Sequence, residues 1–342
     1  MISVQFRNVT QALAWARNYF AILESTEQGI ISPRGAKTVE APEPVCTVYT
    51  HPRERVLLVP SRDANPFFHF FESLWMLAGR RDVAFVRGMV KRMQGFSDDG
   101  VNLWGAYGYR WRRHFGHDQL DELVDLLRAD PDTRRGVLTM WDGVHDQERA
   151  AQGGKDVPCN THVYFKVRQG ALQMTVCNRS NDAIWGAYGA NAVHMSMLQE
   201  YVADRVGVKV GKYRQVSDSL HVYLDGEGTP VWDRLKKAPD KEFDDPYVYE
   251  HTPEPNSLIR PYPMHADEKG WEVDLQVFLE LAQSGGMEME RRMFSTEYFQ
   301  HVAVPLWRGY KQRSEKELAN CAASDWRRAG EQWLARRAEA AS

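Results

Sequence analysis

Two short motifs bring together side chains that could do covalent chemistry. VPCN occupies residues 157–160, and RSND occupies residues 179–182. They offer a thiol nucleophile, a guanidinium that can pair with phosphate oxygens, and a carboxylate. Apolar residues alternate over 163–167 and again over 172–176, with Gln169-Gly170 between them, which predicts a hairpin that carries both motifs. This inventory is typical of a site that modifies a nucleotide.

Cys159 is the candidate nucleophile of this site. A free thiol is only slightly ionised at neutral pH, so it needs a cationic neighbour, and Arg179 on the adjacent strand could be that neighbour. The alternative for an isolated cysteine is an inert position in the core, which is the commoner case. The motifs around Cys159 favour the nucleophile.

Composition limits the other functions open to the chain. None of the four cysteines forms a CxxC pair, and no His/Cys cluster has zinc spacing, so we expect neither a disulfide framework nor a metal site. No apolar run approaches the roughly 20 residues that span a bilayer, and Arg7 and Arg17 do not suit a signal peptide. A formal net charge of −3 gives no general attraction for nucleic acid. We therefore expect a cytoplasmic enzyme with no membrane or nucleic-acid partner, in which local arginines hold a nucleotide.

The elements that must position these residues follow from hydrophobic periodicity. Apolar residues recur at helical spacing over 118–129 and over 191–206, and residues 325–341 form a charged, helix-like tail. Helices that alternate with strands predict an α/β or α+β fold around a mixed sheet. No linker divides the 342 residues. We expect a catalytic domain over 1–230 and a C-terminal extension, 231–342, packed on the same domain.

Six motifs and the single residue Asn191, all in register, give the chain a family resemblance. Together with PC (158–159) and Asn191, the segments FFESLWMLAG (70–79), WGAYGYRWR (104–112), DTRR (132–135), NRSND (178–182) and SDSLHVY (217–223) resemble the thymidylate synthase superfamily, in that order and at similar spacings. The resemblance covers roughly residues 65–225. It implies a mixed sheet surrounded by helices, a homodimer packed through the sheet, a glutamate-bearing helix at 70–79, and a strand at 104–112.

The resemblance also implies a reaction. In this family a thiolate adds to C6 of a pyrimidine nucleotide, so that C5 can attack the one-carbon unit of 5,10-methylenetetrahydrofolate. Cys159 takes the place of that thiol. Glu72, in an otherwise apolar helix, resembles the proton shuttle to the ring O4, although a residue on the polar edge of an amphipathic helix is the alternative. Tyr107 corresponds to a tyrosine that takes part in removing the C5 proton.

The phosphate ligands implied by the family are arginines and a serine. Arg179 and Ser180 resemble the clamp on the nucleotide phosphate. Arg134 and Arg135 correspond to a pair that reaches the phosphate from the partner subunit, which implies a homodimer with shared active sites. A solvated helix cap is the alternative for this pair. Arg34, in SPRG (32–35), is a further phosphate candidate.

Other positions correspond to contacts with the sugar and the folate. His221 and Tyr223 lie two residues apart on one strand and resemble the pair that binds the sugar 3′-hydroxyl, although they could equally be ordinary sheet residues. Asp182 resembles the residue that binds the pterin ring. Trp104 could stack on the pterin, whereas packing in the core is the usual role of any one of the eleven tryptophans.

Departures from the synthase pattern predict the product. The usual Cys-His pair becomes Cys159-Asn160, the loop before Asn191 is one residue longer, and the short apolar peptide that closes the synthase site is missing. A dry, closed site favours hydride transfer and a methyl product. Without that closure we expect water to capture the exocyclic methylene. The chain is then most similar to the pyrimidine nucleotide 5-hydroxymethylases of phages and antibiotic pathways, which places it in a bacterial or phage-infected cytosol.

The identity of the base depends on Asn191, whose amide can match uracil in one orientation and cytosine in the other. Because the uracil enzymes of the family carry asparagine here, dUMP is the expected substrate, and dCMP or CMP is the alternative. Thymidylate synthase itself, with hydride transfer from the folate, is a second alternative. A non-enzymatic nucleotide sensor would show neither turnover nor a covalent adduct with a 5-fluoropyrimidine nucleotide.

Overall fold

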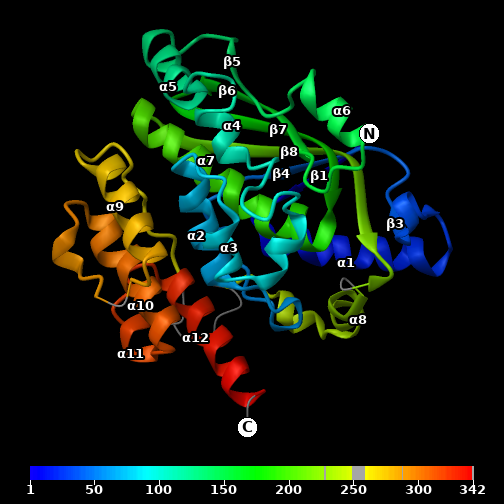
Figure 1. Cartoon of the computed structure of the whole chain (residues 1–342). Coiled ribbons are helices and arrows are strands. Elements are labelled where there is room, and N and C mark those ends of the chain that lie inside the picture. Colours follow the sequence, from blue (N-terminus) through cyan, green and yellow to red (C-terminus); the bar gives the residue numbers. More distant parts are fainter. Residues whose placement is uncertain (227–228, 249–258, 287, 341–342) are drawn as a thin grey trace.

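The fold is built on one mixed sheet. The computed structural model describes residues 1–226, 229–248, 259–286 and 288–340. The main path of the sheet has the order β1-β4-β8-β7-β6-β5, and β3, which pairs with β2, joins the far end of β8 (Figure 1). The strands are β1 (Ile2–Phe6), β2 (Ile30–Ile31), β3 (Thr38–Glu40), β4 (Val45–Tyr49), β5 (Gly136–Thr139), β6 (Asn160–Arg168), β7 (Ala171–Asp182) and β8 (Lys209–Tyr223).

The strand pairing is both parallel and antiparallel. β6 and β7 form the predicted antiparallel hairpin, and Gln169 and Gly170 make its turn with φ of 55° and 69°. β7 then pairs in parallel with β8, and β8 pairs antiparallel with β4. The prediction of a mixed sheet is confirmed.

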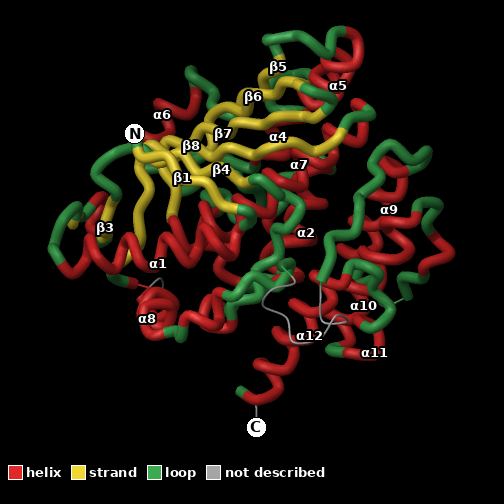
Figure 2. Tube along the Cα trace, turned by 180° about the vertical axis from the view of Figure 1, so that it is seen from behind, coloured by secondary structure: helices red, strands yellow, loops and turns green. Residues whose placement is uncertain are grey.

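Helices cover one face of this sheet. α1 (Val9–Ser25), α2 (Pro66–Leu77) and α7 (Asn191–Val206) lie on that side, as both views show (Figures 1 and 2). Val163 and Phe165 of β6 point into this buried layer, whereas Tyr164 between them is 47% exposed on the opposite face. The alternation that predicted the hairpin therefore separates a helix-covered face from an open one.

Several helices begin and end where the sequence predicts. The helix expected at 118–129 is α5 (Gln119–Ala129), whose N-cap Asp118 accepts hydrogen bonds from two backbone amides. The helix expected at 191–206 is α7, and Gly207 ends it with φ of 81°. The glutamate-bearing helix expected at 70–79 is α2, which begins earlier, with Pro66 after the N-cap Asn65, and ends at Leu77. The shorter helices include α3 (Val83–Arg87), α4 (Tyr107–Arg112), α6 (His145–Ala151) and α8 (Thr229–Lys237).

The C-terminal helices gather beside α2, at the end of the molecule opposite the N-terminus (Figure 1). They are α9 (Trp271–Gln283), α10 (Val304–Gln312), α11 (Glu315–Leu318) and α12 (Ser324–Glu339). α12 corresponds to the charged tail predicted at 325–341. Ala341 lies outside the described residues. Arg337 in α12 makes a bidentate ion pair with Asp63, just before α2, with contacts of 2.7 and 3.1 Å. This contact fixes the end of the chain near the start of the glutamate-bearing helix.

The expectation of a strand at 104–112 is wrong, because Tyr107–Arg112 form helix α4. The segment is rich in aromatic residues that favour strands, but tertiary contacts decide its conformation. Gly108 packs so closely on α2 that an added Cβ would lie 1.9 Å from the Met76 carbonyl oxygen. Arg110 is fully buried and pairs with Asp146. In the described part of the chain, no helix is both long and apolar enough to cross a bilayer.

Candidate active site

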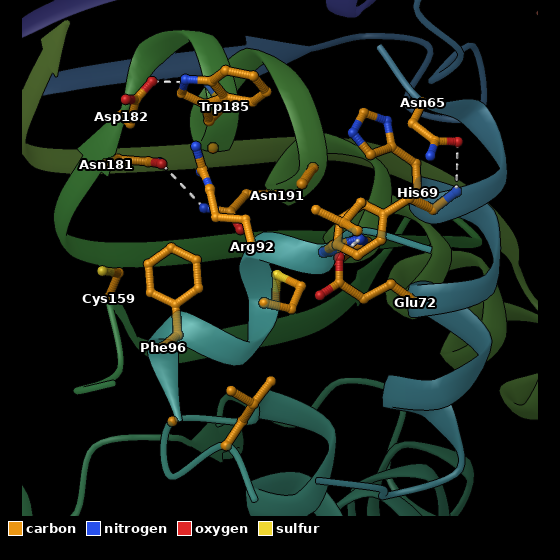
Figure 3. Close-up of a pocket in the computed structure, with 18 of the residues that line it drawn as sticks. Asn65, His69, Glu72, Arg92, Phe96, Cys159, Asn181, Asp182, Trp185 and Asn191 are labelled. Atoms are coloured by element: carbon orange, nitrogen blue, oxygen red, sulfur yellow. Dashed lines mark hydrogen bonds and ion pairs between the residues drawn. The ribbon is translucent and has the colours of Figure 1, made fainter. Parts of the chain in front are cut away.

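A cavity of about 750 Å³ collects most of the predicted site residues. It lies between α2, the segment before α4, the ends of β6 to β8, and the start of α7 (Figure 3). A volume of this size is within the usual range for small-molecule sites. Nine predicted residues line it: Glu72, Tyr107, Cys159, Arg179, Ser180, Asp182, Asn191, His221 and Tyr223.

The hairpin holds the thiol beside a guanidinium. The backbone amide of Arg179 donates to the Cys159 carbonyl oxygen at 2.9 Å, so the two residues face each other across β6 and β7. The Arg179 side chain donates to the carbonyl oxygens of Pro158 and Val157, both at 2.9 Å. Its Nη2 also lies 3.8 Å from Sγ of Cys159. The cation is thus fixed where it favours a thiolate.

The segment before α4 is tied to the loop before Cys159. The Gly105 amide donates to Asp156 at 2.8 Å, and the Asn160 amide donates to the Tyr107 hydroxyl at 3.4 Å. Burial raises the pKa of Tyr107 and also raises the pKa of Asp156. The phenol is therefore neutral and stands close to the candidate nucleophile.

Glu72 stands on α2 and points into the cavity (Figure 3). Its Oε2 lies 3.1 Å from Nε2 of His194 in α7, and the side chains are 11% and 4% exposed, respectively. The contact has the distance of an ion pair but not the alignment of a hydrogen bond, since Nε2 has no hydrogen-bond partner among the residues that the structure describes. His69, one turn before Glu72, is also buried, and its burial lowers its pKa well below the usual value.

A chain of amides fixes the orientation of Asn191. Its Nδ2 donates to Oδ1 of Asn181 at 3.1 Å, and Nδ2 of Asn181 donates to Oγ of Ser217 at 3.1 Å. Gly186 packs against this pair, because an added Cβ would lie 2.6 Å from Oδ1 of Asn181. Among the described residues, hydrogen bonding engages only this one N–H of the Asn191 amide, so its second N–H and its side-chain oxygen could bind a ligand.

A wall of aromatic and charged groups lies around Asp182. Its carboxylate accepts from the amides of Ile184 and Trp185 at 2.7 and 2.8 Å, which starts the π-helical turn Ala183–Ala190. Arg62 lies over the Trp185 ring, 4.3 Å from its centre. Burial lowers the pKa of Arg62 to about 10 and raises the pKa of Asp182.

His221 and Tyr223 lie side by side on β8. Their ring centres are 5.2 Å apart, and His221 pairs in register with Asp182 of β7. Ser180 pairs with Ser219 two residues earlier in the same ladder. The parallel pairing of β7 with β8 therefore delivers these polar side chains to one edge of the cavity.

Three of the described residues among the predicted set do not line the cavity. Arg134 and Arg135 are exposed before β5. The Trp104 indole N–H donates to Asp146 at 2.7 Å, outside the lining. Arg34 lies in the turn Pro33–Gly35, and its side chain is outside the described residues. Among the described residues, no group of three or more His, Cys, Asp or Glu side chains is arranged to hold a metal ion.

Some residues that line the cavity do not belong to the sequence motifs. His69 and His194 each lie three positions from a predicted site residue, so helical spacing from Glu72 and Asn191 would have found them. Arg62 lies outside the matched motifs. Trp333 and Arg337 of α12 also line the cavity, and no local signal in the sequence places them there.

Comparisons with known proteins agree with this architecture. The family model described as thymidylate synthase matches residues 37–246. The chain is 44% identical to the deoxyuridylate hydroxymethyltransferase of Pseudomonas phage M6 over 98% of this chain and 94% of that protein. It is 40% identical to the enzyme of the same name from Bacillus phage SP01, over 64% and 60% of the two chains.

A more distant relative bears a different name. A putative thymidylate synthase of Methanothermobacter marburgensis is 41% identical over 38% of this chain and 56% of that protein. Since the family model covers more than half of the residues and a relative matches almost end to end, the chain belongs to the thymidylate synthase family.

Proposed function

We propose that this one-carbon transferase is a deoxyuridylate hydroxymethyltransferase. The observation that supports the proposal most is the placement of the Cys159 thiol, beside Arg179, in the same cavity as the Glu72 carboxyl. A thiolate in this position can add to C6 of a bound pyrimidine, and a carboxyl on α2 can serve the ring O4. When bound, methylenetetrahydrofolate supplies the one-carbon unit. The hydroxymethyltransferase relatives support capture of that unit by water.

The nucleotide would be held at the edge where β7 and β8 end. We assign Arg179 and Ser180 to the phosphate and His221 with Tyr223 to the sugar, because these side chains line one part of the cavity. Asn191 would read the base. Since its Nδ2 already donates to Asn181, the amide offers one fixed donor and acceptor pair, which suits N3–H and O4 of uracil. A cytosine nucleotide remains the alternative substrate.

The residues present also fit a folate. Trp185 offers an aromatic surface, and Asp182 is the acceptor proposed for the pterin. Arg62 and Arg92 both lie over Trp185, at 4.3 and 5.0 Å from the ring centre. Two cations in this wall suit a ligand that ends in carboxylates.

Helix α12 supports a hydrated site. It brings the Trp333 indole and the Arg337 guanidinium to the cavity lining. Arg337 forms an ion pair with Asp63, so two charged side chains line this part of the cavity. Charged groups retain water, which favours hydroxyl over hydride as the group that completes the product.

A second copy of the chain would complete the phosphate site. Arg134 and Arg135 are exposed and lie outside their own cavity. On the face of the sheet opposite α1, α2 and α7 (Figure 1), Tyr164 is 47% exposed. A homodimer packed through this face would allow these arginines to reach the partner's site. Sedimentation of wild type and Arg134→Ala/Arg135→Ala should show dimers of both, with weaker dUMP binding in the variant; monomeric wild type would contradict the arrangement.

The function is tested by the identity of both products. With dUMP and methylenetetrahydrofolate, we expect a nucleotide heavier by a CH2O unit and the release of tetrahydrofolate. Dihydrofolate, detected by its absorbance, together with dTMP would instead establish thymidylate synthesis. Cys159→Ser should abolish turnover while it preserves dUMP affinity, because the hydroxyl is a far weaker nucleophile. Cys177→Ser, away from the cavity, is the matched control.

A further inference from the structure

His194 is buried at the wall of the cavity, beside the carboxyl of Glu72. Its imidazole lines the cavity, and Nε2 lies 3.1 Å from Oε2 of Glu72. This nitrogen has no hydrogen-bond partner in the part of the chain that the structure describes. A buried polar atom without a partner is costly, so the position calls for an explanation. Catalytic hydrogen bonds are often poorly aligned before the substrate binds.

The packing of two helices creates this contact. His194 lies one turn after Asn191 on α7, and Glu72 lies in the middle of α2, so both helices present a polar group toward the candidate base site. His69 lies one turn before Glu72, with its ring centre 6.4 Å from that of His194. Burial and the nearby charge of Arg62 hold the pKa of His69 well below its usual value. His69 is therefore a neutral neighbour.

Capture of the methylene by water requires the removal of a proton, and hydride transfer does not. When water adds to an exocyclic methylene, one of its protons must be removed, whereas a hydride brings none to remove. A site that captures water therefore needs a base at this step. Glu72 points into the cavity (Figure 3), and Nε2 of His194 lies 3.1 Å from its Oε2.

We propose that His194 accepts, through Glu72, the proton of the water that becomes the hydroxymethyl oxygen. This inference rests on the proposed function. The water oxygen forms a bond to the exocyclic carbon, and the electron pair of the methylene moves to the C4 carbonyl oxygen. That pair then returns, restores the 5,6 double bond and expels Sγ of Cys159 from C6. The proton passes from water to Glu72 and on to His194, which acts as a positioning residue and proton reservoir rather than by contact with the substrate.

The test runs the same step backwards without folate. Given 5-hydroxymethyl-dUMP in heavy-oxygen water, the enzyme should expel the hydroxyl as water and add labelled water back, and mass spectrometry of the nucleotide measures the exchange. We expect His194→Gln to slow this exchange at least about tenfold. Covalent adduct formation with 5-fluoro-dUMP, which requires Cys159 but no water, should stay close to that of wild type.

His117→Gln is the matched control, because His117 lies 2.9 Å from Glu122 in a similar but exposed pair. It should exchange oxygen as wild type does. If His194→Gln fails to form the adduct, His194→Ala with added imidazole replaces it, and recovery of exchange supports the role. The role of His194 is overturned if a His194 variant exchanges oxygen at the wild-type rate. It is also overturned if imidazole does not restore exchange in a variant that forms the adduct. Neither result contradicts the proposed function. Wild-type protein that forms the adduct but exchanges no oxygen overturns the proposed function as well.

Discussion

Replacing Asp146 by asparagine should destabilise the protein strongly, because it breaks a fully buried ion pair. Arg110 and Asp146 have 0% exposed side chains and make two contacts, at 2.6 and 2.8 Å. The Trp104 indole donates to the same carboxylate at 2.7 Å. Removing one partner of a buried pair leaves an uncompensated charge and costs about 3–5 kcal/mol. Because asparagine keeps one acceptor oxygen, we expect a loss of unfolding free energy at the lower end of this range, about 3 kcal/mol.

Urea unfolding followed by tryptophan fluorescence measures this effect. Asp125→Asn is the control, since Asp125 and Arg128 form an exposed pair at 3.7 Å whose loss should change the free energy of unfolding by less than about 0.5 kcal/mol. Arg110→Met with Asp146→Leu should recover part of the loss, because no buried charge then remains unpaired. The reasoning is refuted if Asp146→Asn and Asp125→Asn unfold at the same urea concentration.

Three further predictions concern the site and the pH dependence. Arg179→Lys should lower kcat/KM for dUMP about tenfold or more and should slow the alkylation of Cys159. An ammonium group cannot make the contacts with Pro158, Val157 and Sγ of Cys159 at the same time. Equal alkylation rates in the variant and the wild type would contradict this prediction. Asn181→Leu should reduce the preference for dUMP over dCMP about fivefold, because one hydrogen bond of about 1 kcal/mol fixes the Asn191 amide. Mixed-substrate competition measures this preference, and an unchanged preference would exclude that role for Asn181. Burial raises the pKa of Asp325 from its usual 3.8 to about 7, so the folded state binds more protons than the unfolded state between these values and loses stability as the pH rises through that range. Asp325→Asn should therefore flatten this part of the stability profile, and an unchanged slope in urea titrations would show that another group causes it.

Much of the fold was predictable because its signals are local. The hairpin, α5 and α7 follow from the periodicity of apolar residues, and the caps Asp118 and Gly207 stand at the ends of these helices. The helical conformation within residues 104–112 was not predictable, because the aromatic residues of this segment favour a strand in isolation. Its helical form depends on close packing against α2 and on the buried Arg110, contacts that no local pattern contains.

The sequence by itself determined the candidate thiol, its guanidinium and the amide proposed to read the base. Hairpin register places Arg179 opposite Cys159, and helical spacing places His194 one turn from Asn191, so short-range geometry suffices. Only the tertiary structure decided that α2 and α7 bring Glu72 to His194, and that α12 delivers Arg337 to the same cavity. These contacts join residues more than a hundred positions apart. They arise when helices bury their apolar faces together, and no spacing along the chain encodes the distance between such side chains.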